Sequence, residues 1–146
     1  MKRLILDASV TLSWCFEGQQ TRFSESVLAA VGQGAAPIVP PIWMYEVINV
    51  LAAARRKKLM DQATAATFWN KVSKLVAVVE NPEKSAAHEI LDLAEKYRLT
   101  AYDAAYLELA LREGLPLATL DKDLKRAARA AGVRLFGCNT SPGAPG

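Results

Sequence analysis

Short apolar segments alternate with longer amphipathic segments along almost the whole of this 146-residue chain. Short apolar runs are typical of strands, whereas apolar residues spaced three or four apart are typical of helices. Strands that are apolar on both faces and separated by helices favour a parallel sheet that is covered on both sides, with right-handed crossovers. We therefore expect an α/β protein, a three-layer α/β/α sandwich around a central parallel sheet.

The boundaries of the elements follow from the same pattern. Strands are expected at Arg3–Leu6, Pro37–Val39, Val76–Val79, Leu115–Leu120 and Val133–Phe136. Helices are expected at residues 10–16, 22–32, 42–58, 62–75, 84–98, 101–113 and 122–131. The helix that begins at Ile42 is apolar nearly all round, which predicts that it is packed on most of its sides.

The length suits one domain, expected over residues 1–136. Residues 137–146 contain three Gly and two Pro, and are expected to form a disordered tail. No apolar run approaches the ~18 residues of a membrane span, and Asp7 interrupts the opening apolar run, so a cytoplasmic protein without a membrane partner is expected. Cys15 and Cys138 are too few for a disulfide framework or a thiolate metal site.

Two acidic residues directly follow predicted strands. Asp7 ends Leu4-Ile5-Leu6, and Asp121 ends the strand that precedes the last helix. Ligands of open parallel sheets bind at the carboxyl ends of the strands, so both side chains are expected at one edge. Each also has a purely structural explanation, because Asp7 could lie in a turn with Ser9 as the helix N-cap, and Asp121 could cap its helix. Asp123 is an alternative to Asp121 that the sequence leaves open.

Two further acids belong to helices that begin near this edge. Glu46 and Asn49 are the strongly polar positions of an apolar helix and share one face, so a cation is expected to face the buried carboxylate. Asp103 follows Thr100 in a Thr-x-x-Asp pattern, which is also a version of the capping box. If the predicted topology holds, Asp7, Glu46, Asp103 and Asp121 converge.

Four converging carboxylates predict a cation, because two of them ~4 Å apart repel by about 4 kcal/mol at an effective dielectric constant of 20. Oxygen ligands favour a hard ion, Mg²⁺ or Mn²⁺, over zinc. The single histidine, His88, is expected to be a surface or packing residue. With no activated Ser, Cys or His in the pattern, water activated by the ion is the expected nucleophile, and phosphodiester hydrolysis is the reaction that fits.

Basic residues follow Asp121 at helical spacing. Lys122, Lys125, Arg126 and Arg129 form one stripe of the last predicted helix. This stripe either contacts RNA phosphates next to the site or is an ordinary solvated face, and the sequence does not decide between them. The net charge of +3 is too small to indicate a nucleic-acid-binding protein by itself.

At these residues the sequence resembles the PIN-domain nucleases, and in particular the VapC-type toxins of prokaryotic toxin–antitoxin pairs. The resemblance covers Met1 to about Phe136. It rests on Leu6-Asp7-Ala8-Ser9, Tyr45-Glu46-Val47-Ile48-Asn49-Val50-Leu51, Tyr102-Asp103-Ala104-Ala105-Tyr106-Leu107 and Ala118-Thr119-Leu120-Asp121. Each motif is short, but their order and spacing are specific.

The resemblance implies a metal-dependent endoribonuclease that acts as a toxin. It implies that Asp7, Glu46, Asp103 and Asp121 are the catalytic and metal-binding residues. It implies supporting roles beside them for Ser9, Asn49 and Thr119. It also implies a homodimer, and inhibition by a VapB-like antitoxin whose tail lies across the acidic groove.

Two rival classes have the wrong motifs. Receiver domains carry an acidic pair after the first strand and a lysine after the last, whereas here Asp7 stands alone and Gly137 follows Phe136. Phosphatases of the haloacid dehalogenase class need Asp-x-Asp after the first strand, and this chain has Asp7-Ala8-Ser9. A PIN-like module that binds RNA or protein without cutting remains an alternative.

Overall fold

A computed structural model describes residues 2–76 and 78–137, and in it four strands form a parallel sheet with the order β3-β2-β1-β4. The strands are β1 (Arg3–Leu6), β2 (Ala36–Val39), β3 (Val78–Val79) and β4 (Leu117–Ala118). The pairing Ile5 with Ile38 on one side and Ile5 with Leu117 on the other makes β1 an inner strand. The expected α/β class with a central parallel sheet is confirmed.

Seven helices connect the strands within the described part of the chain. They are α1 (Ala8–Ser13), α2 (Arg22–Gly32), α3 (Ile42–Arg56), α4 (Gln62–Leu75), α5 (Ala86–Tyr97), α6 (Ala101–Glu113) and α7 (Lys122–Ala131). Side-chain caps start several of them: the hydroxyl of Thr100 accepts a hydrogen bond from the Asp103 amide, and a carboxylate oxygen of Asp121 accepts one from the Leu124 amide. Gly114 and Gly132 end α6 and α7 in the left-handed conformation that glycine adopts without strain.

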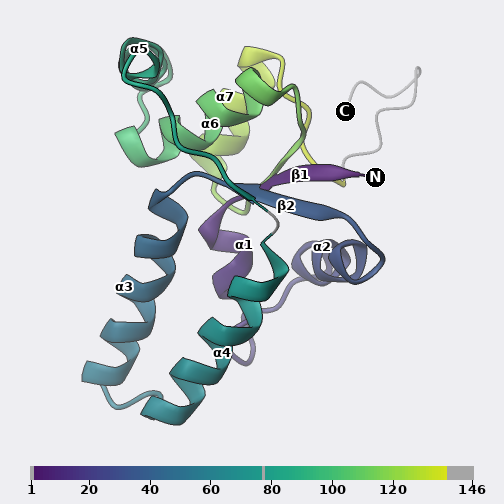
Figure 1. Cartoon of the computed structure of the whole chain (residues 1–146), viewed down its shortest axis with the longest axis vertical. Helices are drawn as coiled ribbons and strands as arrows, with labels where there is room; N and C mark the ends of the chain where they lie inside the picture. Colours follow the sequence, from purple (N-terminus) through teal and green to yellow (C-terminus); the bar gives the residue numbers. More distant parts are fainter. Residues whose placement is uncertain (1, 77, 138–146) are drawn as a thin grey trace.

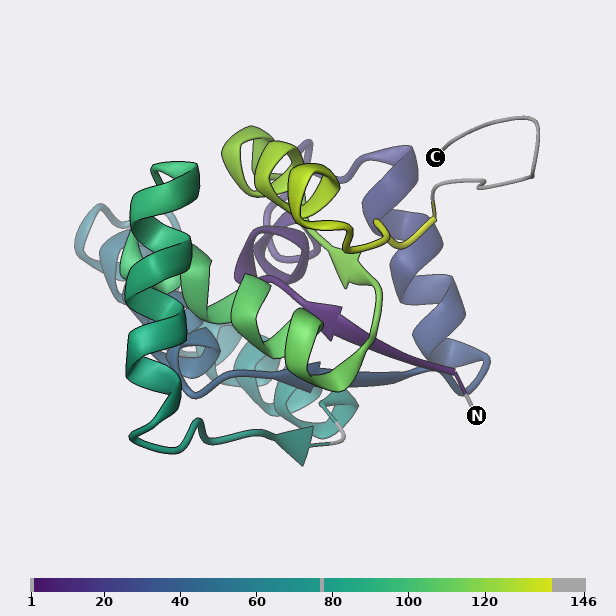
Figure 2. The same ribbon diagram turned by 90° about the horizontal axis from the view of Figure 1, so that it is seen from above.

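The helices cover both faces of the sheet. Figure 1 shows α1, α3 and α4 on one side of the strands, and α5 and α6 on the other. Viewed from above, α7 lies beside the β4 edge and α2 near the amino-terminal end of β1 (Figure 2). The three layers predicted from the alternating pattern are therefore present.

The core is built around β1 and α6. Leu4, Ile5 and Leu6 of β1 are almost completely buried, as are Tyr106, Leu107 and Leu109 of α6. Burying such side chains stabilises the fold by ~1.5 to 3 kcal/mol each. This packing fixes the carboxyl end of β1 relative to the beginning of α6, which is where two of the predicted site acids lie.

Several predicted boundaries differ from those observed. The expected closing strand Val133–Phe136 is wrong as a strand, because the structure contains only an isolated bridge between Leu117 and Leu135 there. The third and fourth strands are shorter than expected, at two residues each. Helix α1 begins at Ala8, immediately after Asp7, rather than at residue 10.

The prediction that α3 is packed on most sides is also wrong. Met44, Tyr45 and Ile48 are exposed, so α3 buries one stripe against α1 and α4 and leaves an apolar face outside. None of the described helices has the length and apolar character that a membrane crossing requires. The predicted disordered tail spans residues 137–146. Its residues 138–146, which include Cys138, lie outside the described residues, so this prediction is not tested there.

Candidate active site

Asp7 lies at the carboxyl end of β1, and its side chain is among the few buried polar groups of the described chain. The residue is 4% exposed. Its backbone amide donates to the Ala118 carbonyl at 3.0 Å, which continues the pairing of β1 with β4. Its Oδ2 atom accepts hydrogen bonds from the hydroxyls of Ser9, at 2.6 Å, and Thr119, at 2.7 Å. The carboxylate is thus held in one orientation by two hydroxyl donors.

The two hydroxyls that hold Asp7 also join the ends of β1 and β4. The Ser9 hydroxyl accepts a hydrogen bond from the Leu120 amide, and the Thr119 hydroxyl accepts one from the Asp121 amide, both at 3.0 Å. Ser9 was one possible N-cap of its helix, but Asp7 occupies the cap position and Ser9 lies within the first turn. Ser9 and Thr119 therefore hold the Asp7 carboxylate directly, and their role in a reaction stays a prediction.

Glu46 lies in α3 and is half-buried. The hydroxyl of Tyr106, on α6, donates to its Oε1 atom at 2.7 Å, and the same hydroxyl accepts a hydrogen bond from the Ala8 amide at 3.3 Å. The cation expected to face Glu46 is absent among the described residues, whose ion pairs lie elsewhere. A neutral phenol satisfies one carboxylate oxygen instead, and it connects α6, α3 and the start of α1.

Asp103 lies in the first turn of α6 and is half-buried, while its own amide donates to Thr100. The capping role predicted for Thr100 and the position of Asp103 at the site are compatible, because the cap uses the backbone of Asp103 and leaves its carboxylate free of that bond. The helix start places this carboxylate near Asp7 and Asp121, whose charges both raise its pKa.

The structure distinguishes Asp121 from Asp123. Asp121 accepts the Leu124 amide through Oδ2, and its charge raises the pKa of Asp7. Asp123 is exposed, and its Oδ1 accepts a hydrogen bond from Arg126 at 3.0 Å in a surface ion pair. Asp121 therefore lies at the end of β4 near Asp7, and its assignment as the fourth site acid in place of Asp123 stays a prediction.

The four acids share one electrostatic environment. Burial raises the pKa of Asp7, against the lowering effect of its hydrogen bonds from Ser9 and Thr119. Burial, with the charges of Asp7 and Asp103, raises the pKa of Glu46 to about 7 although the Tyr106 hydrogen bond lowers it. Burial, followed by the charge of Asp121, raises the pKa of Asp103 to about 6. Such shifts are typical of carboxylates that are buried first and brought near other carboxylates second, with no cation to compensate them.

The donor set suits a hard divalent cation, since it consists of carboxylates supported by hydroxyls. Across residues 2–76 and 78–137, however, no three His, Cys, Asp or Glu side chains are close enough together to hold one ion jointly. Mg²⁺ commonly binds through one or two carboxylates and keeps several waters, completing its shell with substrate phosphates. The residues present fit an ion bound in that manner.

The remaining predicted residues lie at the surface. Asn49 is exposed on the outer face of α3, one turn after Glu46. Lys122, Arg126 and Arg129 are exposed on α7, while Lys125 is half-buried, with Nζ 5.9 Å from the centre of the Phe23 ring. Arg126 also donates to the Tyr97 carbonyl at 3.0 Å, so it connects α7 to the end of α5. His88 is exposed on α5, as expected.

Sequence reasoning missed Tyr106. A buried tyrosine usually needs a hydrogen-bond partner for its hydroxyl. Tyr106 lies in an apolar helix one turn after Asp103, so the sequence indicated that its hydroxyl has a polar partner near the site. Its partner could not be predicted, because Glu46 is 60 residues away. Glu108 was also missed: it is buried on the same helix and pairs with Arg112 at 2.8 Å.

The sequence also matches a family model. The model of the PIN domain matches residues 4–130, which include all four acids. The chain belongs to the PIN-domain family. A curated relative, exonuclease VapC9 from Pyrobaculum aerophilum, is 34% identical over 88 residues, which cover 60% of this chain and 64% of that protein. The aligned region thus spans less than two thirds of the relative.

Solved structures of PIN-like shape agree with this assignment. PAE2754 from Pyrobaculum aerophilum has a TM-score of 0.67 and 26% identity, covering 87% of this chain and 86% of that one. VapBC2 from Rickettsia felis, solved with a DNA fragment from the promoter, has a TM-score of 0.66 and 10% identity, covering 91% of this chain and 96% of that one. At that identity the second likeness concerns the fold alone.

Proposed function

We propose that this PIN-domain protein is a metal-dependent endoribonuclease that acts as the toxin of a toxin–antitoxin pair. The observation that carries the proposal is the group of four acids at the carboxyl edge of the sheet, where burial and mutual repulsion raise the pKa of Glu46 to about 7 and of Asp103 to about 6. Such an arrangement costs stability unless a cation is bound, and it is retained in a chain whose curated relative is named an exonuclease.

Mg²⁺ or Mn²⁺ would be held by one or two carboxylates at a time from the set Asp7, Glu46, Asp103 and Asp121, with water and a substrate phosphate completing its shell. The ion would supply neutralisation of the phosphate charge and a lower pKa for the attacking water. Asp7 is pre-oriented by Ser9 and Thr119, which removes part of the entropy cost of positioning a ligand. Tyr106 holds Glu46 in place from the protein interior.

Cleavage of a circular RNA tests the nuclease proposal and its mode together. A circle has no ends, so an endonuclease opens it in Mg²⁺ or Mn²⁺ whereas an exonuclease does not. We expect opening that stops in EDTA and leaves 5′-phosphate and 3′-hydroxyl ends. We expect no opening by Asp7→Asn, Asp103→Asn or Asp121→Asn, while the control Asp92→Asn, at an exposed position of α5, cuts normally.

Three results would count against parts of this proposal. Cleavage of linear RNA alone would make the protein an exonuclease. Cyclic phosphate products formed in EDTA would exclude the metal-dependent route. RNA binding without cleavage by the wild type would favour the PIN-like module that binds without cutting.

The antitoxin partner is proposed from the chemistry around the acids. Tyr45 and Tyr102 are 64% and 58% exposed, and each immediately precedes a site acid, Glu46 or Asp103. An antitoxin segment could cover these apolar rings and place an Arg among the carboxylates, because a guanidinium binds carboxylates through two parallel hydrogen bonds.

A growth assay tests the toxin role. Expression of the wild type in a related host should arrest growth, co-expression of the neighbouring antitoxin gene should restore it, and Asp7→Asn should be harmless at equal abundance. If cells that express the wild type grow as well as cells that express Asp7→Asn, the toxin role is refuted. The proposed homodimer is tested separately by the mass of the isolated protein in solution.

A further inference from the structure

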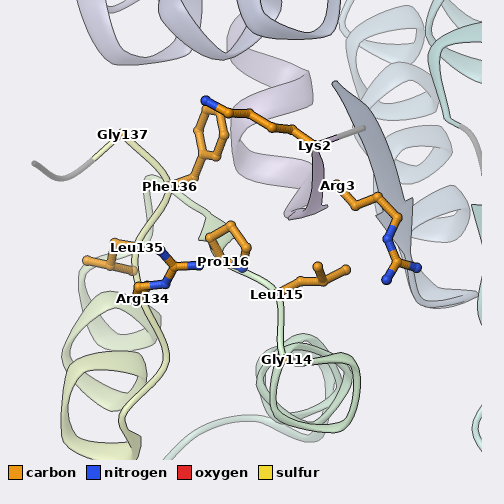
Figure 3. Close-up of a pocket in the computed structure, with 9 residues that line it drawn as sticks. All are labelled: Lys2, Arg3, Gly114, Leu115, Pro116, Arg134, Leu135, Phe136 and Gly137. Carbon is orange, nitrogen blue, oxygen red and sulfur yellow. The ribbon is translucent and has the colours of Figure 1, made fainter. Parts of the chain in front are cut away.

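A hollow of about 360 Å³ lies at the amino-terminal end of β1 and β4, at the edge opposite the acids. Lys2, Arg3 and Arg134 contribute its charged lining, and Leu115, Pro116 and Phe136 contribute apolar lining. Figure 3 shows the Lys2 side chain reaching toward Phe136, and the Arg134 side chain beside Pro116. No acidic residue lines this hollow in the described part of the chain.

The three cations of the hollow have no acidic partner among the residues that the structure describes. The ion pairs among residues 2–76 and 78–137 involve Arg112 and Arg126, not these three residues. All three are exposed, so they attract anions from solution at little desolvation cost. The apolar lining between them suits a ligand that combines negative charge with a flat apolar group, as a nucleotide unit of RNA does.

The hollow is connected to the acidic edge by α7. This helix begins at Lys122, next to Asp121, and its ten residues rise by about 15 Å toward the amino-terminal edge. Lys125 lies over the ring of Phe23, and Phe23 in turn touches the rim of the hollow, because a Cβ atom at Gly137 would lie 3.1 Å from that ring. Lys122 therefore lies beside the acidic edge, and Lys125 lies against a ring that reaches the rim of the hollow.

We propose that this hollow is a second anion-binding site that holds backbone phosphates of a single-stranded RNA whose reacting bond lies at the acidic edge. The proposal rests on the proposed nuclease function. The strand β1, of four residues at about 3.3 Å each, separates the two edges by roughly 13 Å. An RNA bound at both edges thus extends over several nucleotides beyond the reacting bond, and Lys125 lies between the two contacts.

The test measures RNA binding in the full chain carrying Asp7→Asn, so that the RNA stays intact. The hollow is altered by Lys2→Gln, Arg3→Gln and Arg134→Gln together, and the probe is a fluorescent single-stranded RNA of about 16 nucleotides. The matched control loses the same charge at the end of α3, through Arg55→Gln, Arg56→Gln and Lys57→Gln. Circular dichroism checks that each variant is folded.

We expect the altered hollow to weaken binding at least tenfold at low salt, and to reduce the slope of log K against log salt by about 2, at about 0.7 per lost contact. The control should leave the slope unchanged. If the triple variant does not fold, Arg134→Gln alone should reduce the slope by about 0.7.

Equal slopes for the altered hollow and its parent would overturn the inference, as would an equal loss in the control. If the wild type cleaves RNA but the altered hollow and its parent have equal salt slopes, the second site is refuted and the nuclease proposal stands. Absence of both cleavage and RNA binding would refute both. Binding of an acidic peptide that depends on these cations, with RNA binding unaffected, would assign the hollow to a protein partner instead.

Discussion

Replacing Glu46 with Gln should stabilise the metal-free protein at neutral pH and above. The pKa of Glu46 is raised from an ordinary 4.5 to about 7, which means that the folded state disfavours the charged form. The contribution of neutral Glu46 to the free energy of unfolding is therefore fully present below about pH 4.5, and it is lost as the pH rises through about 7. Glu46→Gln removes this titration and keeps an oxygen that can accept the Tyr106 hydrogen bond.

The magnitude follows from the same values. A rise from 4.5 to about 7 corresponds to about 3 kcal/mol at full effect. Glu46 is only half-buried, and solvent screening reduces this to about 1 to 2 kcal/mol. For a domain of this size we expect the melting temperature to rise by about 3 to 8 °C at pH 8, and the difference to disappear below about pH 4.5.

Thermal unfolding in EDTA, followed by circular dichroism between pH 4 and 8, measures this effect. The control Glu95→Gln makes the same charge change at an exposed position of α5 and should stay within about 0.5 kcal/mol of wild type at every pH. Saturating Mg²⁺ should stabilise the wild type and remove the advantage of the variant. A variant equal to or less stable than wild type at pH 8 in EDTA would refute a shared acidic cluster at this edge.

Four further substitutions probe the acids and the groups that hold them. Tyr106→Phe removes the hydroxyl that donates to Glu46 and accepts from the Ala8 amide, and should lower the free energy of unfolding in chemical denaturation by about 1 to 3 kcal/mol. It should also raise the pKa of Glu46, which moves the acid limb of the pH–activity profile to higher pH. An acid limb at the wild-type pH would contradict the positioning role of Tyr106. Thr119→Val should weaken Mn²⁺ binding in calorimetry by raising the pKa of Asp7, and unchanged affinity would argue against it. Asp121→Asn should abolish RNA cleavage whereas Asp123→Asn keeps it, and the reverse result would exchange their roles.

The positions of the strand-end acids followed from the sequence, because parallel strands present their carboxyl ends at one edge. Asp7 and Asp121 are at that edge for this reason, and the beginning of α6 after a Thr cap brings Asp103 there as well. These are local signals combined with one topological rule. The parallel sheet and both helical layers could be inferred from the alternating pattern, whereas the strand order β3-β2-β1-β4 was not predicted.

The contacts between distant elements could not be predicted. Glu46 meets a tyrosine instead of a cation because the Tyr106 hydroxyl of α6 donates to it from 60 residues further along the chain, which no local pattern records. Asn49 is exposed because α3 is covered on one side only, although its sequence is apolar all round. The residues around Leu135 have the composition of a strand, but they make a single bridge to Leu117 and no ladder.

The hydrogen bond from Thr119 to Asp7 joins residues 112 positions apart, so β1 finds its second partner only after residue 119 has been synthesised. During synthesis β1 can pair with β2 early, but its other edge has no partner until β4 has left the ribosome. The acidic edge therefore assembles as one of the last steps of folding. Fragments released before about residue 121 would contain Asp7, Glu46 and Asp103 without the fourth acid, and would lack the complete acidic edge.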